Sequence, residues 1–78
     1  MDGRIETTHA DGATAAMTAR EIAILQALAD HGTADAVARA LGLSVRTVEG
    51  HFQSIRAKLG QSTTLECVVW GMRTKVLA

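Results

Sequence analysis

The chain has 78 residues, 47% of them apolar, with seven glycines and no proline, so it can form one small domain of marginal stability. Its eight basic and eight acidic side chains cancel, which argues against a strongly basic, general nucleic-acid binder. There is no apolar run of membrane-spanning length, no secretory signal, and a single cysteine, Cys67, that cannot form an internal disulfide. We therefore expect a soluble protein of the reducing cytosol.

The charge is unevenly distributed along the chain. Residues 1–16 carry −2 and residues 17–43 carry −1, whereas residues 44–58 carry +2 and residues 59–78 carry +1. The positive excess is modest, but it lies in the C-terminal half. This is the half that contains the helix with the most distinctive polar face.

Residues 1–16 show no sustained apolar period and are rich in Thr, Ala, Gly and Asp. We predict a flexible N-terminal arm here, either a linker from a preceding domain or the natural start of a small protein. His9 has no second candidate ligand near it, so a solvated tail residue is favoured over a metal ligand.

The first helix is predicted to begin at Thr18, which forms a Ser/Thr-x-x-Glu capping box with Glu21. Met17 and Ile22 occupy the positions of a hydrophobic staple across this start. The helix is predicted to end at Gly32. Its expected apolar face consists of Ile22, Leu25, Leu28 and Ala29.

A second, shorter helix is predicted after Thr33, which can cap it. Its expected buried residues are Val37, Ala38 and Leu41. Several alanines would let this helix pack closely against the next one. The connection through Gly42 and Leu43 to Ser44 has the length and the glycine of a helix-turn-helix.

The helix predicted from Ser44 to Leu59 has two different faces, and Gly60 can end it. Its apolar stripe, with spacings of three and four, consists of Val45, Val48, Phe52, Ile55 and Leu59. The opposite face consists of Arg46, Glu49, Gly50, Gln53 and Ala57. Because these side chains are small or hydrogen-bonding, the face could enter a DNA major groove. On this helix alone, an ordinary solvated face is an equal alternative.

The last helix is predicted to begin at Thr63, which forms a second capping box with Glu66. Its expected inner face consists of Leu65, Val68, Val69 and Met72, with Val76 as a further candidate. The outer face then holds Cys67, Trp70 and Arg73 or Thr74. An exposed tryptophan in so small a domain indicates a second protein surface. The alternative is that residues 1–16 fold over Trp70.

Five groups of residues recur in the order and spacing of a known pattern. They are Met17, Thr18, Arg20 and Glu21; Gly32, Thr33, Val37, Ala38 and Leu41; Ser44, Thr47, Val48 and His51; Ile55, Lys58, Leu59 and Gly60; Glu66 and Val68. The pattern reads roughly L-T-x-R-E, G-x-S-N-K-E-I-A-x-x-L, S-x-x-T-V-K-x-H, I-x-x-K-L-G and E-A-V. From Met17 to about Leu77 the chain thus resembles the LuxR/FixJ/GerE-type DNA-binding domain.

The resemblance implies an all-α fold, a four-helix LuxR-type helix-turn-helix domain over residues 17–78. Its third helix would be the recognition helix in the major groove, and its fourth the dimer helix. The predicted base-reading residues are Arg46, Glu49, Gly50 and Gln53. The predicted phosphate contacts are Ser44, Thr47, His51, Arg56 and Lys58. The predicted dimer surface consists of Cys67, Trp70 and Arg73.

Three residues depart from the family pattern. Glu49 and Asp35 stand where lysine is common, and Thr64 stands where arginine is frequent, so three potential contacts lose a positive charge. We therefore expect weak monomer binding that depends on dimerisation. Glu49 can still accept a hydrogen bond from cytosine N4, and Gln53 can pair with adenine N6 and N7.

The leading hypothesis is a sequence-specific bacterial transcription regulator, or its output domain, that binds double-stranded DNA as a homodimer. It would work in the cytoplasm, on the nucleoid when bound, with RNA polymerase as a further partner and no membrane partner. The alternative is a protein interaction module, an adaptor or anti-regulator, that keeps the fold with weak or no DNA binding. The zero net charge and the acidic substitutions motivate this alternative.

An enzyme is not expected. The histidines and the cysteine have neither metal-ligand spacing nor a nucleophile motif around them, and the chain has no Gly-rich phosphate loop. The residues considered are His9, His31, His51 and Cys67. We therefore predict no catalytic residue, no metal site and no cofactor.

Overall fold

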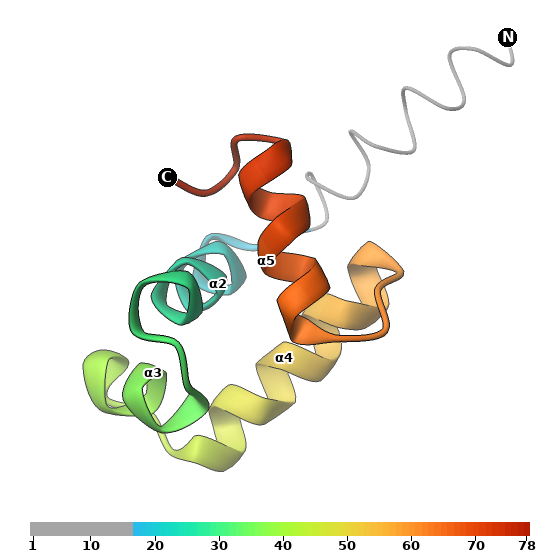
Figure 1. Ribbon diagram of the computed structural model, residues 1–78. Coiled ribbons are helices and arrows are strands. Elements are labelled where there is room, and N and C mark those ends of the chain that lie inside the picture. Colours follow the sequence, from blue (N-terminus) through green and yellow to red (C-terminus); the bar gives the residue numbers. More distant parts are fainter. Residues whose placement is uncertain (1–16) are drawn as a thin grey trace, which may run out of the picture.

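The computed structural model describes residues 17–78, which form four helices and, in that range, no strand. The helices are labelled as in Figure 1: α2 (Ala19–His31), α3 (Ala34–Leu41), α4 (Val45–Leu59) and α5 (Thr64–Arg73). The predicted all-α, four-helix fold is confirmed. The arm predicted over residues 1–16 lies outside the described residues. Of the four helices described, none has the length and the apolarity needed to cross a membrane.

The helix ends are set by local hydrogen bonds. Thr18 Oγ1 accepts a hydrogen bond from the Glu21 amide at 3.0 Å, and the Glu21 carboxylate accepts one from the Thr18 amide at 2.9 Å. Thr63 and Glu66 form the same reciprocal pair at the start of α5. Both predicted capping boxes are confirmed, and each satisfies amides that have no partner within the helix. The C-terminal ends of α2, α3 and α4 are glycines with positive φ: Gly32, Gly42 and Gly60.

A short turn joins α3 to α4. Gly42 has a φ of 69°, and the Leu43 amide donates a hydrogen bond to the Ala38 carbonyl at 2.9 Å, so the chain changes direction directly after α3. Ser44 Oγ then accepts a hydrogen bond from the Thr47 amide at 3.0 Å and caps α4. The start of α4 therefore lies beside α3 (Figure 1), as predicted for a helix-turn-helix.

The core lies between α2 and α4, each of which contacts all three other helices. The largest fully buried side chains are Ile24, Leu25, Ile55, Val37, Val48 and Cys67. The predicted α2 face was partly correct: Leu25 is buried, but the prediction missed Ile24 and Ala27. The buried arc of α2, which faces α3, α4 and α5, is therefore wider than the single stripe assumed in the prediction.

The predicted inner face of α5 is correct at Val68 and wrong at Leu65, Val69 and Met72, while Val76 lies beyond the helix and is half-buried against the core. The buried residues of α5 are Cys67, Val68 and Gly71. The large apolar side chains that are exposed are Leu65 (71%), Val69 (38%) and Met72 (54%). The helix is therefore rotated about its axis relative to the prediction.

The C-terminal segment explains this rotation of α5. The Leu77 amide donates a hydrogen bond to the Gly71 carbonyl at 3.0 Å, and the Leu77 side chain is buried. A Cβ atom at Gly71 would lie 2.6 Å from Leu77 Cγ, so the close contact requires glycine there. Cys67, one turn earlier, is also small. The side of α5 that carries Gly71 and Cys67 can thus approach the core more closely than the side that carries Leu65.

Candidate nucleic-acid interface

Helix α4 has a buried side and an exposed side, as predicted from the sequence. Its buried residues are Val48, Phe52 and Ile55, with Val45 and Leu59 half-buried against the same core. Its exposed residues on the opposite side are Arg46, Glu49, Gly50, Gln53 and Ala57. The core contacts therefore set the rotation of α4 so that a polar surface faces outwards. We call Arg46, Glu49, Gly50 and Gln53 the α4 outer face.

The polar side chains of the α4 outer face are available to a partner. Within residues 17–78, Arg46, Glu49 and Gln53 make no side-chain hydrogen bond and no ion pair. The face thus presents a guanidinium group, a carboxylate and an amide with their donors and acceptors unused. These are groups that can recognise base edges in the major groove.

Ser44 and Thr47 lie at the N-terminal end of α4, next to the α4 outer face. The Ser44 hydroxyl donates a hydrogen bond to Thr47 Oγ1 at 2.8 Å and accepts one from the Thr47 amide. Its proton is therefore used inside the cap, whereas the Thr47 hydroxyl retains a proton for an outside acceptor. His51 is half-buried one turn further along. Helix polarity also favours an anion at this end of α4.

Arg56 and Lys58 have partners inside the domain. Arg56 Nη1 donates a hydrogen bond to Thr64 Oγ1 at 2.8 Å, which ties the end of α4 to the start of α5. Lys58 Nζ lies 2.7 Å from Glu21 Oε1, and the Lys58 side chain is only 30% exposed. Both cations therefore hold helices together. A phosphate contact from either would have to use its remaining donors.

Glu21 is a buried carboxylate that joins α2 to α4. It accepts hydrogen bonds from Lys58 Nζ, from the Thr18 amide and, at 3.2 Å, from Ser54 Oγ. Burial raises the pKa of Glu21, but these hydrogen bonds and the Lys58 charge outweigh burial and hold the pKa below its usual value of 4.5. The carboxylate is therefore charged at neutral pH and anchors the C-terminal half of α4 to the first turn of α2.

Sequence analysis missed the contact between Glu21 and Lys58, which lie 37 residues apart. No periodicity connects two residues at such a separation. The one available signal was that both residues match the family pattern.

The structure corrects the dimer surface predicted on α5. Cys67 is fully buried, so its placement on that surface is wrong. Burial raises the pKa of the Cys67 thiol, which therefore stays protonated as a small core group. Arg73 is exposed, as predicted, and Trp70 is half-buried.

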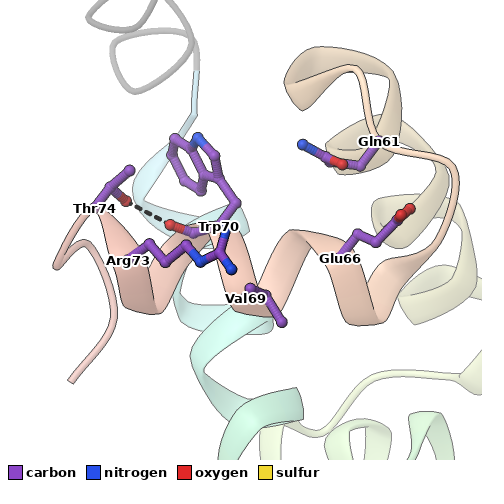
Figure 2. A pocket seen from close by; sticks show the side chains of 6 residues that line it. All are labelled: Gln61, Glu66, Val69, Trp70, Arg73 and Thr74. Atoms are coloured by element: carbon purple, nitrogen blue, oxygen red, sulfur yellow. Dashed lines mark hydrogen bonds between the residues drawn. The ribbon is translucent and has the colours of Figure 1, made fainter.

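Trp70 lines an open cavity of about 400 Å³ on the outer side of α5 (Figure 2). The other lining residues are Gln61, Glu66, Val69, Arg73 and Thr74. The Thr74 hydroxyl donates a hydrogen bond to the Trp70 carbonyl at 2.8 Å and so holds the C-terminal edge of this cavity.

An apolar surface replaces the one that was predicted on α5. It consists of Leu65, Val69 and Met72, which we call the α5 apolar face. Their spacings of four and three place them on one side of the helix, and Val69 also lines the cavity beside Trp70. Three large apolar side chains grouped on one exposed helix side indicate a contact surface.

A comparison with protein families agrees with this arrangement. The family model described as "Bacterial regulatory proteins, luxR family" matches residues 15–71, which include α2, α3, α4 and most of α5. The chain belongs to the luxR family. Searches among curated proteins and among solved structures gave no significant match.

The luxR family consists of DNA-binding regulatory domains and is not a family of enzymes. In the part of this luxR-family chain that the structure describes, no three His, Cys, Asp or Glu side chains form a group that could hold a metal ion. The exposed polar surface of α4 makes the α4 outer face the candidate site, with Thr47 and His51 beside it.

Proposed function

We propose that this chain is a sequence-specific transcription regulator, or the output domain of one, that binds double-stranded DNA with α4 in the major groove. One observation carries the proposal. Arg46, Glu49 and Gln53 project from the domain and have no partner among residues 17–78, while the other side of α4 is anchored in the core. Residues 17–78 would be the DNA-binding domain and residues 1–16 an arm or linker.

The roles within the site follow from side-chain chemistry. Arg46 can donate two hydrogen bonds to guanine, Glu49 can accept one from cytosine N4, and Gln53 can pair with adenine N6 and N7. Thr47 and His51 are the best placed phosphate contacts. Ser44, Arg56 and Lys58 could supplement them only by sharing or giving up donors that they use inside the domain. Phosphate contacts would orient α4, and base contacts would select the sequence.

Dimerisation is part of the proposal because the charge is small. Residues 44–58 carry only +2, so one domain can neutralise few phosphates. Two domains joined through the α5 apolar face would bind two half-sites about 34 Å apart, or one helical turn. The proposed setting is the bacterial cytoplasm, on the nucleoid when DNA is bound, with RNA polymerase as a further partner.

Gln53→Ala is expected to weaken binding to the preferred duplex by about 1–3 kcal/mol and to relax the preference at one base pair. The reason is that alanine lacks the amide that would pair with a base edge. The measurement is a selection of sites from random duplexes, followed by titration of the selected duplex. Gln26→Ala, the same truncation on α2, should change neither the affinity for the selected duplex nor the base preference. An unaltered affinity and base preference for Gln53→Ala would remove Gln53 from this role.

A salt titration separates the regulator from the alternative of a protein interaction module. The zero net charge of the chain and the carboxylate of Glu49 on the α4 outer face favour the module. For the regulator, the logarithm of the binding constant should fall linearly with the logarithm of the salt concentration, by about 0.9 for each phosphate contact. Absence of duplex binding at low salt would contradict the regulator and support the module.

A further inference from the structure

Gly50 lies in the interior of α4, at a position where the fold has no need of glycine. Glycine destabilises a helix interior relative to alanine, because it loses more backbone freedom on folding. A Cβ atom at Gly50 would meet no atom within 4 Å. Gly50 does not have a positive φ either, because the described glycines with positive φ are Gly32, Gly42 and Gly60. The described structure would thus accept an alanine here and become more stable.

The other described glycines have structural reasons for their identity. Three of them end helices with positive φ: Gly32, Gly42 and Gly60. Gly71, the other glycine inside a helix, lies against Leu77, and a Cβ there would be 2.6 Å from Leu77 Cγ. Among residues 17–78, Gly50 is therefore the glycine whose identity no internal contact explains. This points to a contact with something outside the chain.

The surroundings of Gly50 indicate where that contact is made. Arg46 is four residues before it and Gln53 three residues after it, so both are its neighbours on the helix surface. These residues and Glu49 are exposed and make no side-chain hydrogen bond or ion pair with the described residues. Gly50 thus forms a notch in the middle of a polar surface. The notch has the size of the missing side chain and offers no hydrogen-bonding group.

We propose that Gly50 is the point of closest approach between α4 and DNA, and that its Cα accommodates the C5 methyl group of a thymine. This deepens the proposed function and rests on it. Each base pair presents hydrogen-bonding groups in the major groove, and thymine adds the methyl group, which needs no hydrogen-bond partner. A notch without donors or acceptors, flanked by side chains that have them, suits that methyl group.

The test exchanges one methyl group between protein and DNA. Wild-type chain first selects a duplex from a random library, and each thymine in the selected site is then replaced in turn by uracil, which lacks the C5 methyl. At one position, the wild type should bind the uracil duplex about fourfold more weakly, since a buried methyl contact is lost. Gly50→Ala should bind the thymine duplex about tenfold more weakly than the wild type, because two methyl groups would overlap.

The decisive comparison is Gly50→Ala on the uracil duplex. There the alanine methyl takes the place of the thymine methyl, so the variant should recover most of its lost affinity at that one position. The same variant should melt about 4–8 °C higher than the wild type, because alanine favours the helix. Ala23→Gly, at an exposed position within α2, should melt lower and bind DNA as the wild type does.

Two outcomes overturn the inference while the proposed function stands. One is an unchanged affinity of Gly50→Ala for the thymine duplex when Gln53→Ala still weakens binding. The other is that Gly50→Ala loses the same affinity, relative to the wild type, on the thymine duplex and on every uracil duplex. If the wild type binds no duplex at low salt, the proposed function fails, and the inference fails with it.

Discussion

Lys58→Met is expected to lower the free energy of unfolding by about 2 kcal/mol, which corresponds to a fall of about 8–16 °C in the melting temperature. The variant leaves the Glu21 carboxylate, whose side chain is only 6% exposed, without its cation. The effect stays below that of a fully buried pair because the Lys58 side chain is 30% exposed. Urea and thermal unfolding at neutral pH measure it.

Two further variants control for the loss of a surface charge. Arg39→Met removes a cation from an exposed position on α3 and should leave the melting temperature nearly unchanged. Glu21→Gln combined with Lys58→Met should be more stable than Lys58→Met alone, because no uncompensated charge stays buried. A melting temperature of Lys58→Met equal to that of the wild type would show that Glu21 does not depend on this ion pair.

Acid should reduce the difference in the free energy of unfolding between the wild type and Lys58→Met. In the folded wild type the pKa of Glu21 lies below its usual value of 4.5, so the charged carboxylate stabilises the fold fully above about that pH. This stabilisation is lost as the pH falls through the folded pKa. In Lys58→Met, burial opposes ionisation with less compensation, so this loss on acidification should be smaller. Urea unfolding of both proteins between pH 7 and pH 3 measures the difference, and a constant difference would contradict the assignment.

The double substitution Val69→Glu and Met72→Glu is expected to abolish the proposed dimer and to weaken binding to a duplex with two half-sites about 100-fold. Both side chains are exposed in the α5 apolar face, so the monomer should keep its fold and its melting temperature. In a dimer, however, four carboxylates would be buried against each other. Sedimentation across protein concentration and titration of the duplex measure the two effects.

A single half-site duplex provides the control for that double variant. Its affinity should not change, because the α4 outer face is untouched. Ala23→Glu, which adds a carboxylate to an exposed position on α2, should leave sedimentation and binding as in the wild type. If the double variant still binds both half-sites as the wild type does, the α5 apolar face is not the dimer contact.

Helix α4 could be predicted well because only one rotation about its axis buries all of its apolar residues. Its apolar residues occupy one side at spacings of three and four, polar residues occupy the other, and Ser44 and Gly60 mark its ends. The exposed position of Glu49 and Gln53 followed directly from that pattern. What they bind is a further step, which rests on the family match and on their free donors and acceptors.

Helix α5 could not be oriented in the same way, because apolar residues occur almost all around it. Leu65, Val69 and Met72 follow the spacing of a helical stripe more regularly than the other apolar residues of α5. The opposite side of the helix is nevertheless the one that is buried. That choice depends on Gly71, which accepts Leu77 at close range, and so on a segment that returns from the end of the chain. Periodicity alone carries no information about such a contact.

The sequence by itself determined the four helices, the capping boxes of α2 and α5, the turn between α3 and α4 and the outward side of α4. All of these depend on hydrogen bonds and side-chain spacings within a few residues. Only the tertiary structure decided that Cys67 is buried, that Leu65, Val69 and Met72 are exposed, and that Lys58 is bound to Glu21. The physical reason is that burial and ion pairing depend on which surfaces meet, and residues far apart in the chain decide that.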